Sequence, residues 1–323
     1  MLGLLVIVAV GFAAQMIDGS LGMGYGVLSM SLLLAIGLTP AVASATVHIA
    51  KIGTALASGV AHWRFGNVDG TVMLLLAIPG AIGAYLGAVL LSSLSLSTAR
   101  PYVSVLLLVL GGVIVARFLH GRRNPSTTVE RPKRPRWLLA PLGLIGGFVD
   151  ASGGGGWGPV TTSTLVASGQ LAPRTTIGTV NAAELAVAVA ASLGFLQSLG
   201  SAGVRWDVTA AMLIGGVLAA VPAAWLVRHI NERTLGIAVG ALILLLSADS
   251  VLTLLELPQD LLMLVRIGGL IVTGVLFAAA FVHGRLKNRA AARKTDAEPG
   301  DAPSSEYDRG PSSATDEVET EPV

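Results

Sequence analysis

The chain has 323 residues, of which 53% are hydrophobic and only 12% charged, with a mean hydropathy of +0.74 and a formal net charge of +2. Soluble domains carry roughly 25% charged residues, so this composition excludes an ordinary soluble protein and indicates an integral membrane protein. Apolar runs of about 20 residues recur along most of the length, which predicts many membrane-spanning α-helices. Cysteine is absent, which excludes disulfides and thiolate chemistry.

The first predicted element is a hydrophobic segment over about residues 1–38 that is interrupted by glycines. The break runs Asp18-Gly19-Ser20-Leu21-Gly22-Met23-Gly24-Tyr25-Gly26. Backbone freed from helical bonding is tolerated at membrane depth only where protein or a wet cavity satisfies it. Each side of the break is expected to be too short to span about 30 Å, which favours a hairpin of two short helices. A bent spanning helix is the alternative.

Three helices near 40–61, 70–92 and 101–119 are predicted to complete a first repeat, residues 1–119. A basic, proline-containing loop follows at 120–136. The positive-inside bias predicts that this loop is cytoplasmic, and we do not interpret its charge as a nucleic-acid patch.

The second half repeats the pattern over residues 137–254. Its broken segment, about 137–170, contains Asp150-Ala151-Ser152-Gly153-Gly154-Gly155-Gly156-Trp157-Gly158-Pro159, and helices near 173–198, 207–229 and 234–254 follow. Pro40 matches Pro173, both at a plausible helix start. Paired interrupted segments are the best sequence pointer to a transporter's binding site.

One more helix is expected within 255–284, and the tail 285–323 is predicted to be disordered and cytoplasmic. The tail is basic from Arg285 to Lys294 and rich in Asp, Glu, Ser and Pro from Thr295 onward. If both hairpins stay on one side, each repeat crosses the membrane three times. The two halves are then inverted relative to each other, and the loop and tail share the cytoplasmic side. The predicted fold is therefore an all-α polytopic membrane protein with two inverted repeats and one extra helix.

Lys51 and Glu184 occupy matching positions, each eleven residues after its helix-starting proline. That spacing is about 16 Å along a helix, close to the bilayer midplane. A charge at that depth is expensive, so it is expected to face a cavity and to have a partner. We predict a Lys51–Glu184 ion pair that acts in transport; the alternative is a buried pair that only fixes helix packing.

His48 lies three residues before Lys51 and shares its helical face, and its counterpart in the second half is Asn181. An imidazole can move protons or hydrogen-bond an oxyanion. The alternative is a neutral histidine satisfied by a neighbouring carbonyl. With five histidines, no cysteine and no HxxH or HxxxH spacing, no metal site or other cofactor is predicted.

The glycine breaks are the predicted substrate contacts, because exposed backbone N–H groups and helix N-termini attract anions. The positions that the breaks contribute to this substrate site are Ser20, Gly22, Gly24, Ser152, Gly154, Gly155 and Gly156, and the helices that follow contribute Lys51, His48, Asn181 and Glu184. Close packing of helices by small residues is the alternative. Asp18 and Asp150 precede the breaks and either take part in ion coupling or cap the returning helices.

These features resemble the TauE/SafE-type sulfite and organosulfonate exporter family: the doubled glycine break, the proline after each broken segment and the basic central loop. The similarity covers about residues 3–255. It implies a bacterial inner-membrane carrier for small sulfur-containing or organic anions. The first break departs from the commoner family pattern, because Leu21, Met23 and Tyr25 intervene between its glycines.

The predicted function is therefore export of a small anion by a secondary transporter, driven by an ion gradient with a proton or cation as the coupling ion. The only partners expected besides that ion are the anionic substrate and the bilayer, without nucleic acid, and no oligomeric state is predicted. An anion-conducting pore and a non-transporting membrane scaffold or sensor are the alternatives. No catalytic motif is present, so an enzyme is not expected.

Overall fold

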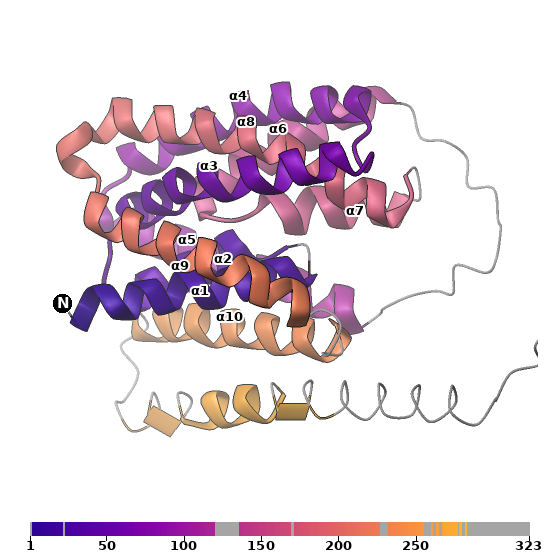
Figure 1. Ribbon diagram of the computed structural model, residues 1–323. Coiled ribbons are helices and arrows are strands. Elements are labelled where there is room, and N and C mark those ends of the chain that lie inside the picture. The colour runs from indigo at the N-terminus through magenta and orange to yellow at the C-terminus, as the bar shows by residue number, and fades with distance from the viewer. Residues whose placement is uncertain are drawn as a thin grey trace, which may run out of the picture. The chain divides into compact units, whose positions relative to one another are not determined.

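The computed structural model describes residues 2–21, 23–119, 136–168, 171–226 and 232–254, and further on 260, 263–264, 267–276, 278–279 and 282. Over these residues the chain forms helices and no β-strand, which confirms the predicted all-α fold (Figure 1). Nearly all of the central loop, the whole tail and much of the extra helix lie outside the described residues. Gly22 and the side chain of Ser20 do so as well.

The first half contains α1 (Leu2–Leu21), α2 (Tyr25–Ala35), α3 (Pro40–Arg64), α4 (Gly70–Ser93) and α5 (Leu96–Leu119). Two helices differ from expectation. α1 has 20 residues, about 30 Å, because the helix continues past Asp18. α5 begins at Leu96 and not at Pro101, because the Ser95 carbonyl accepts the backbone N–H groups of Thr98 and Ala99 and starts the helix earlier.

The second half contains α6 (Leu139–Gly153), a π-helical turn η2 (Gly158–Thr162), α7 (Ser163–Ser168), α8 (Pro173–Leu199), α9 (Trp206–Leu226) and α10 (Glu232–Leu254). Short 3-10 turns precede α6 and α9, at Arg136–Leu138 and Ser201–Gly203. Pro40 and Pro173 are the first residues of α3 and α8, where a missing N–H costs nothing. The Asp69 side chain caps α4 by accepting the Val72 N–H at 3.0 Å.

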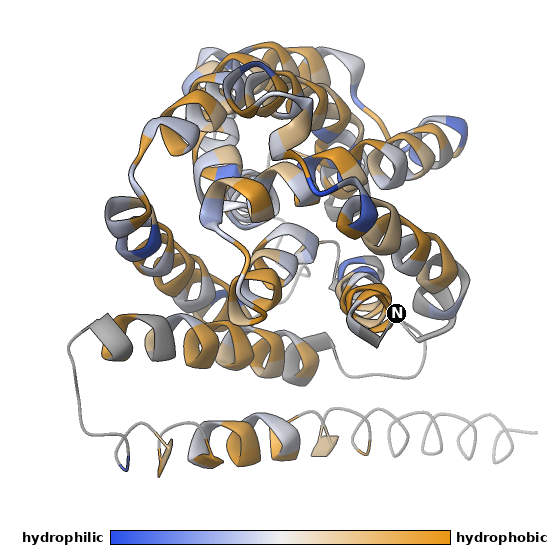
Figure 2. Cartoon of the chain, turned by 90° about the vertical axis from the view of Figure 1, so that its left-hand side faces the viewer, coloured by the Kyte–Doolittle hydropathy of each residue, from blue (hydrophilic) through white to orange (hydrophobic). Residues whose placement is uncertain are grey.

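Three of the described helices are long and apolar enough to cross a membrane: Gly70–Ser93, Leu96–Leu119 and Thr175–Leu199. Shorter apolar stretches lie in the other main helices, such as Gly3–Asp18 in α1 and Leu235–Ala248 in α10. Large hydrophobic side chains remain exposed along these helices, including Leu74, Ile78 and Ile82 on α4. Hydrophobic colouring dominates the described helices (Figure 2), as expected for surfaces that face lipid.

The two halves interlock through their helices. α1 packs against α9 and α6 against α4, while α3 packs against α8 and α5 against α10. Glycines allow the first two contacts: a Cβ atom built on Gly11 would lie 2.4 Å from the Met212 carbonyl oxygen, and one on Gly143 would lie 2.5 Å from that of Leu76. Gly143 lies 132 residues after Gly11. These matched contacts support the predicted repeat, and its inversion across the membrane stays a prediction.

Candidate functional site

The two glycine breaks cross each other in direct backbone contact. A Cβ atom built on Gly155 would lie 2.0 Å from the backbone nitrogen of Val27, and one built on Gly26 would lie 2.5 Å from the Cα of Gly155. No side chain fits into such a crossing, so both positions require glycine. Gly24 and Gly154 have φ angles of 116° and 80°, in the left-handed region. This conformation turns the backbone away from α1 at the first break and away from α6 at the second. The crossing brings the two predicted half-sites together.

Each break is held by the aspartate that precedes it. Asp18 Oδ1 accepts the backbone N–H of Tyr25 at 3.1 Å, and Asp150 Oδ1 accepts that of Trp157 at 2.9 Å. Both bonds span seven residues, and both end on the aromatic residue with which the chain resumes a helical course. A carboxylate at a helix N-terminus satisfies a free N–H and favours the positive end of the helix dipole. This is the geometry expected when Asp18 and Asp150 cap the helical segments that follow the breaks.

Substitutions at Asp18 separate its cap from its charge. Asp18→Asn keeps an acceptor oxygen on the side chain, so we expect it to lower the thermal unfolding midpoint in detergent less than Asp18→Ala does. Asp18→Ala leaves the Tyr25 N–H without its partner and is expected to cost about 1.5–3 kcal/mol, the usual value of a hydrogen bond to a charged group. Equal loss of stability in the two variants would show that the charge, and not the cap, holds the break.

Lys51 lies between two carboxylates where the breaks meet. Its Nζ atom is 2.5 Å from Glu184 Oε1 and 3.6 Å from Asp150 Oδ1. The ion pair expected from the repeat is therefore present, with Asp150 as a second partner that the repeat did not suggest. The Lys51 side chain is 6% exposed, that of Glu184 14% and that of Asp150 0%. At such burial, removal of one partner leaves an uncompensated charge, which is strongly destabilising.

His48 links α3 to α6 behind this pair. Its Nε2 atom is 3.1 Å from Asp150 Oδ2, and its Nδ1 atom is 2.8 Å from the Ser44 carbonyl oxygen. Ser44 Oγ in turn donates to the Ala151 carbonyl oxygen at 2.7 Å. Both imidazole nitrogens thus face oxygen atoms, which fixes the orientation of the ring between Ser44 and Asp150.

A small cavity lies beside this cluster at the crossing. It is lined by Asp18, Met23, Gly24, Tyr25, Gly26, Lys51, Gly155, Trp157, Gly158, Pro159, Val180, Asn181 and Glu184. Its volume of about 10 Å³ admits a single water molecule. An anion of several atoms therefore needs the breaks to move apart before it reaches Lys51.

The structure divides the residues predicted for the site into two groups. Asp18, Gly24, Lys51, Gly155, Asn181 and Glu184 line the cavity. Ser152 points away to α5 instead, where its Oγ accepts the Tyr102 hydroxyl at 3.0 Å. Gly154 and Gly156 face Met30 and Val149, so their missing side chains serve packing. His48 and Asp150 lie behind the cavity and hold Lys51.

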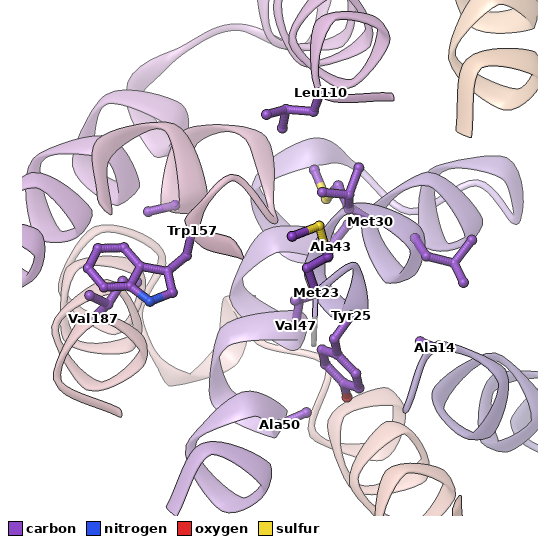
Figure 3. Packing of buried hydrophobic residues seen from close by; sticks show 14 of the residues in the cluster. Ala14, Met23, Tyr25, Met30, Ala43, Val47, Ala50, Leu110, Trp157 and Val187 are labelled. Carbon is purple, nitrogen blue, oxygen red and sulfur yellow. The ribbon is translucent and has the colours of Figure 1, made fainter. Parts of the chain in front are cut away.

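Sequence reasoning missed the role of the two aromatic residues within the breaks, Tyr25 and Trp157. Trp157 is fully buried, and its Nε1–H donates to the Val180 carbonyl oxygen at 3.0 Å. Tyr25 is 2% exposed and lies apart from Trp157 (Figure 3). Tyr25 and Trp157 are 132 residues apart, as Asp18 and Asp150 are, and that spacing was the signal that would have found them.

Comparisons with known proteins agree with this architecture. The family model described as sulfite exporter TauE/SafE matches residues 7–249. The chain is also similar to the probable membrane transporter protein YtnM of Bacillus subtilis (strain 168), with 45% identity over 284 residues that cover 87% of this chain and 94% of the relative. No solved structure matches the chain.

Proposed function

Because the chain belongs to the sulfite exporter TauE/SafE family of membrane transporters, we propose that it is a secondary transporter for small oxyanions such as sulfite or sulfonates. We further propose that it exports them across the bacterial inner membrane, with the central loop and the tail on the cytoplasmic side. The observation that carries the proposal is the buried lysine in a cavity lined by both glycine breaks.

The charges of the site favour an exchange of partners at Lys51. Lys51 is the one lysine or arginine among the described residues that line the cavity, and its Nζ atom already forms an ion pair with Glu184. An anion that enters must compete with this carboxylate for the same ammonium group. We propose that Glu184 leaves Lys51 when the anion binds and returns when the anion departs. Each breakage of the pair is then linked to a step of the transport cycle.

The same charges support coupling to protons. The Lys51 ammonium group already pairs with Glu184 and lies 3.6 Å from Asp150 Oδ1, so a bound anion adds negative charge that Lys51 alone does not balance. Uncompensated charge is costly at that depth. Uptake of a proton by the displaced Glu184 removes the excess. The anion therefore moves together with at least one proton in this scheme.

Glu184→Gln tests this coupling. The amide keeps the shape of the side chain but cannot take up a proton, so we expect methanesulfonate flux in proteoliposomes to persist under an imposed membrane potential. Its dependence on a pH gradient should disappear, whereas wild-type flux responds to the pH gradient because a proton accompanies the anion. A pH response in Glu184→Gln equal to that of the wild type would exclude Glu184 as the coupling group.

The transport assay also separates the alternatives. A carrier gives saturable flux and counterflow exchange, whereas an anion pore gives ohmic single-channel currents. A scaffold or sensor gives neither. The closed cavity favours a carrier, because its volume of about 10 Å³ leaves no room for a passing anion in this conformation.

A further inference from the structure

A second group of polar side chains surrounds Gly216, where α1, α2, α3 and α9 meet. A Cβ atom built on Gly216 would lie 3.4 Å from Thr54 Cγ2, 3.9 Å from Tyr25 Oη and 4.0 Å from Gln15 Cβ, so the position has room for one small group. Tyr25 Oη and Gln15 Oε1 are both buried and have no hydrogen-bond partner among the described residues. We call these four residues, Gln15, Tyr25, Thr54 and Gly216, the Gly216 pocket.

The matching place in the second half, around Gly80, is filled by apolar side-chain atoms. There the Trp157 ring would lie 2.8 Å from a Cβ atom on Gly80, and Val187 Cγ2 3.1 Å from it. A Cβ atom on Gly147 would lie 2.0 Å from the Gly80 carbonyl oxygen. Trp157, Gly147 and Val187 are the repeat counterparts of Tyr25, Gln15 and Thr54.

The two halves therefore share one scaffold but differ in its chemistry. Three polar side chains in the first half replace an indole, a glycine and a valine in the second (Figure 3 shows Trp157 beside Val187, and Tyr25 apart from them). A buried polar group without a partner costs about 1–3 kcal/mol. Gln15 and Tyr25 each carry one such atom in the first half, whereas the side chains at the equivalent positions around Gly80 are apolar. This difference indicates a site for a ligand that forms hydrogen bonds.

The Gly216 pocket lies close to the charged cluster. Gln15 precedes Asp18 by three residues on α1, and Thr54 follows Lys51 by three residues on α3, with its Oγ1 donating to the Lys51 carbonyl oxygen at 3.2 Å. Three residues of helix rise about 4.5 Å. Tyr25 also lines the cavity that contains Lys51.

We propose that the Gly216 pocket is an oxygen-binding subsite for the transported oxyanion, which places one oxygen atom there as it moves off Lys51. Tyr25 Oη donates a hydrogen bond to that oxygen. The Gln15 amide donates a second one, since a turn of the amide group exchanges its oxygen for its nitrogen. Neutral donors suit this step, because the adjacent charged groups on the packed elements are Asp18, Lys51, Asp150 and Glu184, three of them acidic. The inference rests on the proposed function.

Two variants test the subsite without disturbing the cluster. Tyr25→Phe keeps the ring and the backbone N–H that Asp18 accepts, and Gly216→Ala places a methyl group in the free space. We expect each to raise the half-saturating methanesulfonate concentration for uptake into proteoliposomes about tenfold, the loss typical of one hydrogen bond to a charged group. The thermal unfolding midpoint should not fall, because the Tyr25 hydroxyl has no partner to lose among the described residues.

Matched controls are Tyr85→Phe, where the hydroxyl donates to Gln197 on the exposed surface, and Gly112→Ala, where nothing lies within 4 Å of an added Cβ atom. Both should transport like the wild type. Unchanged half-saturation in Tyr25→Phe and Gly216→Ala would overturn the subsite, because the pocket would then hold at most a water molecule. A lowered unfolding midpoint for Tyr25→Phe would also overturn it, by assigning the hydroxyl a structural role. Absence of anion flux in the wild type would reject the proposed function instead.

Discussion

Replacement of Lys51 by alanine is expected to abolish anion transport. The substitution removes the ammonium group that we propose to bind the anion, and it leaves Asp150 and Glu184 side by side without a cation between them. Breaking a buried pair in this way typically costs about 3–5 kcal/mol, so part of the effect will be on stability. Flux in proteoliposomes, normalised to the amount of folded protein inserted, measures the transport defect alone.

A charge-balanced variant separates the two effects of this substitution. Lys51→Met together with Glu184→Gln removes both charges of the pair and retains approximately the same volume. We expect the unfolding midpoint of this double variant to be close to that of the wild type, well above that of Lys51→Ala. Its transport should remain absent. Recovery of transport along with stability would show that Lys51 serves only helix packing, the alternative considered from the sequence.

Gly155→Ala is expected to prevent the protein from reaching its folded state in the membrane. The added methyl group would lie 2.0 Å from the backbone nitrogen of Val27 and 2.2 Å from the carbonyl carbon of Gly26. Backbone atoms cannot change rotamer to make room, so the crossing of the two breaks must open. The cost is therefore expected to exceed the roughly 1–3 kcal/mol that is usual for overpacking.

The yield of monodisperse protein after detergent extraction measures this effect, and Gly112→Ala is its control, since nothing lies within 4 Å of the added atom. Gly26→Ala should behave like Gly155→Ala, because its methyl group meets the same crossing from the other side. Normal yield and normal transport in both variants would contradict the direct contact between the breaks.

Much of this site could be predicted from the sequence because the repeat carries positional information. Equal distances from Pro40 and Pro173 identified Lys51 and Glu184 as partners before any coordinates were considered. The glycines and the aspartates of the breaks were found in the same way. The family was correctly identified as TauE/SafE from the doubled break, and the helix starts at the two prolines were correct as well.

Other features depend on how the helices pack, which periodicity does not encode. The position of Asp150 between Lys51 and His48 follows from the contact of α3 with α6. The orientation of Ser152 toward Tyr102 follows from the rotation of α6, and sequence reasoning placed that serine in the binding site. The unexpected length of α1 arises because Gly19 and Ser20 continue the helix although they begin the glycine-rich stretch.

We propose that Lys51, enclosed where the two breaks cross, holds the transported anion. Counterflow of labelled methanesulfonate into preloaded proteoliposomes tests it most directly, because exchange requires substrate binding but no external driving force. We predict rapid, saturable exchange for the wild type and none for the stable Lys51→Met, Glu184→Gln double variant. Exchange by that variant at the wild-type rate and affinity would contradict the claim.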